Sequence, residues 1–175
     1  MKKILSGLLF ISGLALLFSC SDGIDYEKIR REELANLKLY IDNVHPGAEP
    51  TASGLYYFNE EGTGHGDTIK LGDQVQIYYA TWALYDGTDS VLVDQTNGYL
   101  LGHRYEPYKF IPGAGTSIAG LEEAITYMQP GTRSHLVINS ELAYGQNGST
   151  SGGIGMFQTI LMEVEVYKVI PRETE

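Results

Sequence analysis

Few side chains in this sequence are placed for covalent or metal chemistry. The four histidines, His45, His65, His103 and His135, are scattered, and none stands at the short helical spacing of a metal-binding pair. Cys20 is the single cysteine, so no internal disulfide can form. No Ser/His/Asp order and no pair of acids matches a hydrolase pattern. The sequence therefore predicts a protein without a metal, a cofactor or a hydrolytic centre.

A glycine-rich segment, residues 145–155, superficially resembles a phosphate-binding loop. It lacks the Lys-Ser or Lys-Thr ending of such loops and leads into a predicted strand instead of a helix. The chain carries a net charge of −10, which disfavours binding to nucleic acid. We expect a flexible loop here and no nucleic-acid partner.

Two tyrosines and one aspartate remain as candidates for a polar site. Tyr79 and Tyr144 could equally be core residues, since the chain has 13 tyrosines. Asp94 could bond a backbone amide in any sheet protein. Whether the three act together depends on the elements that position them.

Short apolar or aromatic runs separated by glycine follow residue 54 and predict β-strands at 55–58, 75–84, 108–111, 135–138 and 159–169. The last run alternates most clearly, with Ile160, Met162 and Val164 on one face and charged residues on the other. One strong helix is predicted, at about 118–128. Such a helix can bury its apolar stripe only across one face of the sheet. We therefore predict an α+β fold with five or six antiparallel strands.

The N-terminal residues 1–19 have the pattern of a signal peptide. Lys2 and Lys3 precede an apolar run that is shorter than the ~20 residues needed to span a bilayer. The four residues ending in Cys20, Leu-Phe-Ser-Cys, resemble the lipobox of bacterial lipoproteins. We expect an exported cell-envelope protein held on a membrane through lipid on Cys20. A chance cysteine after an ordinary signal peptide, or an uncleaved membrane anchor, is the alternative.

A helix is predicted at residues 26–43, with Ile29, Leu34, Leu37 and Ile41 near helical spacing and opposite charges three and four apart. It could be a spacer helix lightly docked on the domain or a dedicated partner-binding helix. The prolines in 45–50 end it. We expect a lipidated tether, spacer helix and linker over residues 20–53 and a main domain over 54–175.

The motifs of residues 54–170 resemble the FKBP-type peptidyl-prolyl isomerase family in order and spacing. The resemblance is carried by YKFIPGAGTSIAGLEEAITYMQPG, which begins at Tyr108, by ELAYG, which ends at Gly145, and by Tyr79, Asp94 and the closing strand. Family members fold as an antiparallel sheet curled around one short helix, with a proline-binding pocket between them. The resemblance implies isomerase activity on proline-containing polypeptides.

The resemblance also implies the pocket residues. The set is Tyr79 and Asp94 as a polar pair, Tyr108, Met162 and Val93 as walls, Leu121 as the floor, Ile118 through its backbone amide, and Tyr144 through its hydroxyl. The last two would bind carbonyls on either side of the proline.

Four pocket positions depart from the commonest family pattern. Leu121 and Met162 stand where aromatic residues are usual, Val93 replaces a phenylalanine, and Tyr108 adds a hydroxyl to one. We expect an apolar cage with less flat surface, which would weaken macrolide inhibitors more than turnover.

Two loops also depart from the family pattern. Residues 96–107 form a long apolar insertion that could be a strand, a lip over the pocket, or a segment packed on the domain. Residues 146–157 replace the proline-bearing flap of many relatives, so the residues preferred beside proline should differ.

The expected chemistry needs no proton transfer. Rotation about a peptide bond costs ~18–20 kcal/mol because the bond is partly double. A pocket that cages the proline ring and removes water from the carbonyl can stabilise the twisted amide. We expect an isomerase that helps exported polypeptides fold, and the alternative is a catalytically weak binding module or subunit of an envelope-associated complex.

Overall fold

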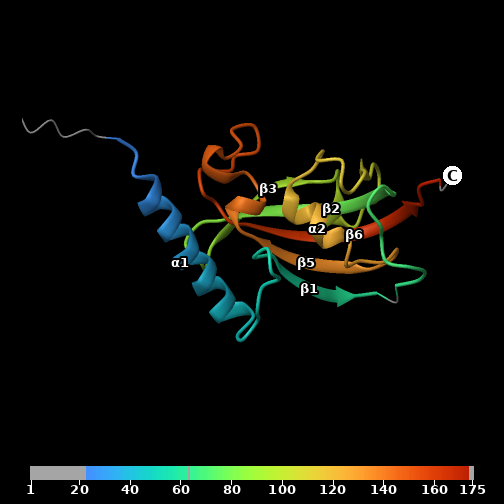
Figure 1. Ribbon diagram of the computed structural model, residues 1–175, viewed down its shortest axis with the longest axis horizontal. Helices are drawn as coiled ribbons and strands as arrows, with labels where there is room; N and C mark the ends of the chain where they lie inside the picture. Colours follow the sequence, from blue (N-terminus) through green and yellow to red (C-terminus); the bar gives the residue numbers. More distant parts are fainter. Residues whose placement is uncertain (1–22, 63, 174–175) are drawn as a thin grey trace, which may run out of the picture.

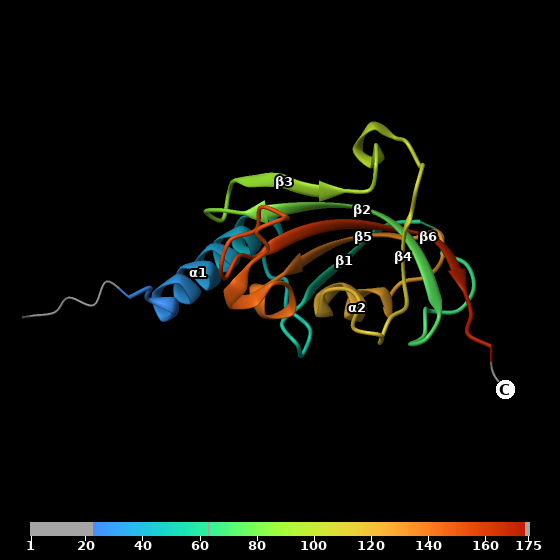
Figure 2. The ribbon, with the colours of Figure 1, turned by 90° about the horizontal axis from the view of Figure 1, so that it is seen from above.

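The computed structural model describes residues 23–62 and 64–173, which form one curved antiparallel sheet with a helix on each face (Figures 1 and 2). The strands are β1 (Tyr56–Glu61), β2 (Gln74–Leu84), β3 (Ser90–Gln95), β4 (Tyr108–Phe110), β5 (Arg133–Ile138) and β6 (Ile160–Ile170). The helices are α1 (Tyr26–Val44) and α2 (Ala119–Ile125), with short 3-10 turns η1 (Tyr99–Leu101), η2 (Ser140–Leu142) and η3 (Gly145–Asn147). The predicted fold class is confirmed. The predicted signal peptide and Cys20 lie outside the described residues.

The sheet is built around the long antiparallel pair β2 and β6. Its strand order is β1-β5-β6-β2-β3, and β4 pairs with β2 along the same edge as β3. β4 takes the first half of β2, where Ile77 opposes Tyr108, and β3 takes the second half, where Thr81 opposes Asp94. The two short strands therefore meet beside the middle of β2.

The concave face of the sheet holds the main core. α2 lies across this face of the sheet, as Figure 2 shows, and its Leu121, Ala124 and Ile125 are buried in the core. Alternate residues of the strands supply the other side, including Val75, Ile77, Leu136, Ile138, Ile160, Val164 and Val166. The alternation predicted for β6 is confirmed.

The opposite, convex face is covered in part by α1. The predicted helix is confirmed, and its Leu37, Tyr40 and Ile41 pack on residues of β2, β5 and β6. Leu34 was expected in the buried stripe but is 44% exposed, whereas its neighbour Glu33 is buried. The helix is thus docked through a polar contact as well as an apolar one.

Residues 96–107 also pack on the convex face. Tyr99 is buried, lies parallel to the ring of Tyr78, and donates its hydroxyl to Glu163 at 2.7 Å. Arg104 lies over both rings and donates to both carboxylate oxygens of Glu165. Of the three alternatives for this insertion, packing on the domain is correct, since the pocket described below lies on the other face.

One predicted boundary needs correction, and one strand was not predicted. α2 ends at Ile125, not Met128, because the amides of residues 126–128 bond three residues back and tighten the last turn. β3 was not predicted, because Val91 and Leu92 of this edge strand are both exposed and its pattern does not alternate.

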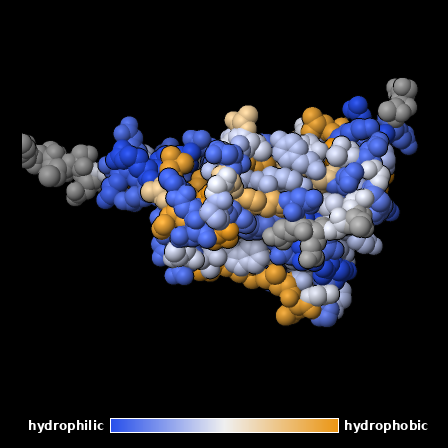
Figure 3. Space-filling view, turned by 90° about the horizontal axis from the view of Figure 1, so that it is seen from below, coloured by the Kyte–Doolittle hydropathy of each residue, from blue (hydrophilic) through white to orange (hydrophobic). Residues whose placement is uncertain are grey.

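The described surface carries scattered apolar residues. Viewed from below, it is mainly hydrophilic with separate apolar spots (Figure 3). Within residues 23–62 and 64–173, no helix is long and apolar enough to cross a membrane, and no cluster of three His, Cys, Asp or Glu residues could hold a metal ion.

Gly120 allows α2 to approach the sheet, and a methyl group there should destabilise the fold. A Cβ at Gly120 would lie 2.5 Å from a methyl group of Ile138, which is fully buried. We expect Gly120→Ala to lower the free energy of unfolding by about 1–3 kcal/mol, measured by urea denaturation. Gly155→Ala is the matched control, since only the flexible Gln158 side chain is near it. Equal stability of the two variants would contradict the tight packing.

Candidate active site

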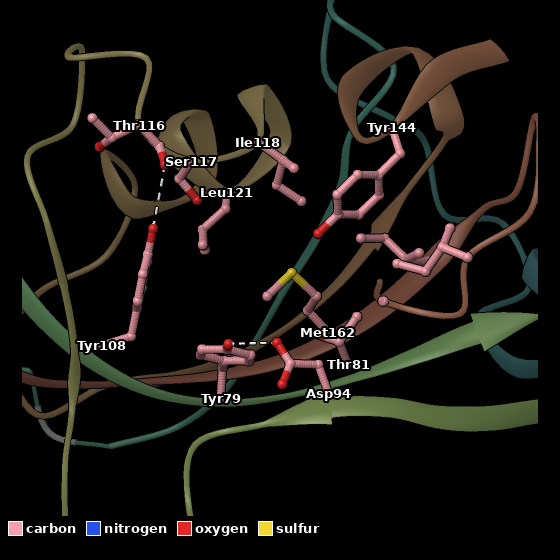
Figure 4. Close-up of a pocket in the computed structure, with 13 residues that line it drawn as sticks. Tyr79, Thr81, Asp94, Tyr108, Thr116, Ser117, Ile118, Leu121, Tyr144 and Met162 are labelled. Carbon is pink, nitrogen blue, oxygen red and sulfur yellow. Dashed lines mark hydrogen bonds between the residues drawn. The ribbon is translucent and has the colours of Figure 1, made fainter. Parts of the chain in front are cut away.

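A pocket of about 290 Å³ lies between the N-terminal end of α2 and the concave face of the sheet (Figure 4). Its lining residues come from β2, β3, β4, β6 and α2, from the loop that precedes α2, and from the segment between β5 and β6. They are Tyr79, Thr81, Asp94, Tyr108, Thr116, Ser117, Ile118, Leu121, Tyr144, Gly152, Ile154, Ile160 and Met162.

One wall of the pocket is a polar pair supported by an aromatic ring. The hydroxyl of Tyr79 donates to Oδ2 of Asp94 at 2.7 Å. The ring of Tyr108 meets that of Tyr79 edge-to-face, with centroids 5.9 Å apart, and its hydroxyl donates to the carbonyl of Thr116 at 3.4 Å. The meeting of β3 and β4 beside β2 brings these three side chains together.

The floor of the pocket is apolar. Leu121 from α2 and Met162 and Ile160 from β6 are all at most 4% exposed. Their side chains face the cavity from opposite sides, with Leu121 above and Met162 below in Figure 4. A ring placed between them would lose most of its contact with water.

Two hydrogen-bond donors lie across the pocket from Asp94. Ile118 caps the N-terminus of α2 in an extended conformation, and within the described residues its amide donates to no protein acceptor. Tyr144 lies between η2 and η3 and directs its hydroxyl into the pocket (Figure 4). Both donors are therefore available to a bound carbonyl.

The loop before α2 is shaped by one carboxylate. Glu122 accepts hydrogen bonds from the amides of Gly113, Gly115 and Ser117, at 3.0–3.4 Å. This fixes the turn that carries Thr116 and Ser117 to the rim. The side of the pocket formed by this loop is thus held by backbone hydrogen bonds to α2.

Tyr79 and Tyr144 both have a raised pKa and remain neutral at ordinary pH. Burial, followed by the hydrogen bond to Asp94 and the charge of that carboxylate, raises the pKa of Tyr79. Burial, followed by the charge of Asp94, also raises the pKa of Tyr144. Both phenols are therefore hydrogen-bond donors and not proton-transfer groups near neutral pH.

Seven of the eight pocket residues inferred from the sequence line this cavity. Val93 does not line it and packs against the adjoining core. The sequence reasoning did not find Thr81, Thr116, Ser117, Gly152, Ile154 and Ile160. Alternation in β6 could have found Ile160, which shares a face with Met162. The segment treated as a flexible glycine-rich loop contributes Ile154, which is 5% exposed.

The fold and the site define an α+β protein with a pocket of about 290 Å³ between a sheet and a short helix, which has an apolar floor and polar walls. Residues 66–167 match the family model described as FKBP-type peptidyl-prolyl cis-trans isomerase. The chain therefore belongs to the FKBP-type peptidyl-prolyl cis-trans isomerase family.

Relatives and solved structures agree with this assignment. The FKBP-type 22 kDa peptidyl-prolyl cis-trans isomerase of Escherichia coli is 36% identical over 153 residues, which are 86% of this chain and 67% of that protein. The isomerase FKBP7 of Pongo abelii is 36% identical over 110 residues, 62% of this chain, and the chain spans only 47% of its length.

Two solved structures have similar folds. Escherichia coli FkpA superposes with a TM-score of 0.64 and 28% identity over 83% of this chain and 63% of its own. A peptidyl-prolyl cis-trans isomerase of Pseudomonas syringae has a TM-score of 0.66 and 22% identity, over 85% of this chain and 98% of its own, which shows a shared fold.

Removing the charge of Asp94 should lower the pKa of Tyr79. The carboxylate accepts the phenol hydrogen and opposes its loss, so Asp94→Asn weakens both effects. We expect the Tyr79 resonance to titrate at lower pH in the variant, measured by NMR on protein labelled at the tyrosine Cζ. Asp67→Asn, an exposed acid outside the pocket, should leave it unchanged. An unchanged Tyr79 titration in Asp94→Asn would contradict this electrostatic coupling.

Proposed function

We propose that this protein is a peptidyl-prolyl cis-trans isomerase that acts on exported polypeptides. The observation that carries the proposal is the pocket itself, in which an apolar floor lies between two donors and a tyrosine–aspartate pair. The names of the similar proteins, which include the 22 kDa Escherichia coli isomerase, support the same activity.

The pocket suits a reaction whose barrier is loss of amide resonance. A proline ring seated on Leu121 and Met162 would leave its preceding carbonyl away from bulk water, where the planar, polar amide is less favoured. The amide of Ile118 and the hydroxyl of Tyr144 would hold carbonyls on either side of the ring. Each ~1.36 kcal/mol of stabilisation of the twisted form gives tenfold in rate.

The proposed cellular setting is the envelope. It is supported by the charged start, the apolar run and the lipobox-like residues that end at Cys20. Isomerisation of X-Pro bonds takes tens to hundreds of seconds unaided and can limit folding, so an isomerase placed there would speed late folding steps.

Activity should depend on the hydroxyl of Tyr144. We expect Tyr144→Phe to lower kcat/KM on a proline tetrapeptide about fivefold, the equivalent of one hydrogen bond worth ~1 kcal/mol. Stopped-flow measurement on the full chain tests this. Tyr105→Phe removes the same atom from an exposed residue outside the pocket and should have wild-type activity. A wild-type chain with no rate above background, but with a stoichiometric envelope partner, would favour a binding module instead.

Membrane attachment should depend on the thiol of Cys20. We expect Cys20→Ser to abolish incorporation of labelled fatty acid in a bacterial host and to move the protein out of the membrane fraction, because the thiol carries the lipid in lipoproteins. Ser19→Ala, which keeps a small residue before the cysteine, is the control and should still be labelled. Membrane retention of unlabelled Cys20→Ser would support an uncleaved anchor.

A further inference from the structure

A buried carboxylate joins α1 to the pocket-bearing part of the domain. Glu33 of α1 is 5% exposed, although Glu32 before it and Leu34 after it are exposed. Its Oε1 accepts from the amide of Ser140 at 2.6 Å and from the hydroxyl of Thr159 at 3.1 Å, and its Oε2 accepts from the hydroxyl of Ser140 at 2.7 Å. Arg30 pairs with the same carboxylate.

The two partners of Glu33, Ser140 and Thr159, lie at the two ends of residues 139–159, which are called segment 139–159 below. Ser140 and Thr159 are both at most 2% exposed. The chain between them forms a loop whose two ends both bond the carboxylate of Glu33. This segment carries three lining residues of the pocket, Tyr144, Gly152 and Ile154, and Thr159 directly precedes a fourth, Ile160. Glu33 therefore holds the base of a loop that forms one side of the pocket.

Docking of α1 does not by itself require this contact. The C-terminal half of the helix is anchored by Leu37, Tyr40 and Ile41, and His45 beyond it stacks on Phe58 with ring centroids 3.8 Å apart. A buried carboxylate is costly unless its oxygens are well paired. The burial of Glu33 is therefore explained better by its hydrogen bonds to Ser140 and Thr159 than by a need to attach the helix.

Further contacts of α1 reach the same segment. Arg30 also donates to the hydroxyl of Ser140 and pairs with Glu141 at 3.0 Å. The ring of Tyr26 meets that of Phe157 edge-to-face at 6.3 Å. The N-terminal half of α1 thus contacts the segment near both of its ends.

We propose that Glu33 is a positioning residue for the isomerase pocket. It fixes the ends of segment 139–159 so that the hydroxyl of Tyr144 and the side chain of Ile154 face the substrate. α1 is then part of the working site and not a passive spacer. The inference rests on the proposed activity, but its structural part can be measured separately.

The test compares Glu33→Gln with Glu32→Gln in the full chain. Glutamine keeps the shape of Glu33 but replaces one accepting oxygen by a donor, so the pair with Ser140 is disrupted. We expect kcat on a proline tetrapeptide to fall about tenfold with KM changed less than about twofold, since small displacements of aligned groups act on the reacting state. Glu32 is exposed, and among the described residues its one ion pair is with Lys28, so its variant should match the wild type.

Hydrogen exchange provides a readout that is independent of activity. Amides of segment 139–159 should exchange at least about tenfold faster in Glu33→Gln, while those of β2 and β6 keep wild-type protection. If the wild-type chain has no activity, the proposed function fails, and this exchange difference still decides whether Glu33 holds the segment. Unchanged exchange, or unchanged kcat in an active chain, would overturn the proposal.

A second pair of variants covers the case in which Glu33→Gln does not fold. Thr159→Val removes one hydrogen bond to Glu33 and keeps the buried volume, whereas Thr159→Ser keeps the hydroxyl. We expect faster exchange of segment 139–159 and lower kcat in the valine variant, with both restored toward wild type by serine. Equal behaviour of the two variants would count against the role of Glu33.

Discussion

The alternation of side chains along the paired strands β2 and β6 is the constraint on which the rest of the structure depends. Ile160 and Met162 face α2 and the pocket, while Leu161 between them faces α1. One pair of strands therefore supports two covers, with α2 and the pocket on one face and α1 on the other. Apolar packing is separate on the two faces, and the two covers are linked through Glu33 of α1, which bonds Ser140 and Thr159.

The elements that follow a local pattern could be predicted from the sequence. β6 alternates from Ile160 to Val166 and α1 has a long amphipathic run, so both were found with nearly correct ends. β3 was missed because an exposed edge strand buries too little apolar surface to show alternating apolar and polar residues in its sequence. The insertion 96–107 was recognised as apolar enough to pack, but the face it covers depends on Glu163 and Glu165, which are distant in sequence.

In the candidate site, too, residues that belong to a sequence motif could be predicted, whereas a residue that depends on contacts distant in sequence could not. Tyr79, Asp94 and Tyr144 were named from a family pattern, and the fold brings all three to one cavity. Glu33 could not be found in this way, since a glutamate in a charged helix normally lies in solvent. Its burial depends on Ser140 and Thr159, which are more than 100 residues away along the chain.

The position of the first turn of α1 limits where the protein can work. Tyr26 lies beside Phe157 of segment 139–159. The start of α1 and this segment are at the end of the molecule opposite the C-terminus (Figure 1). Six peptide steps separate it from Cys20, and a fully extended chain of that length spans no more than about 20 Å. With the proposed lipid in place, this short connection would keep the end of the domain that carries Tyr26 and Phe157 close to the bilayer. Polypeptide segments still emerging from or lying along the membrane would then be its nearest substrates.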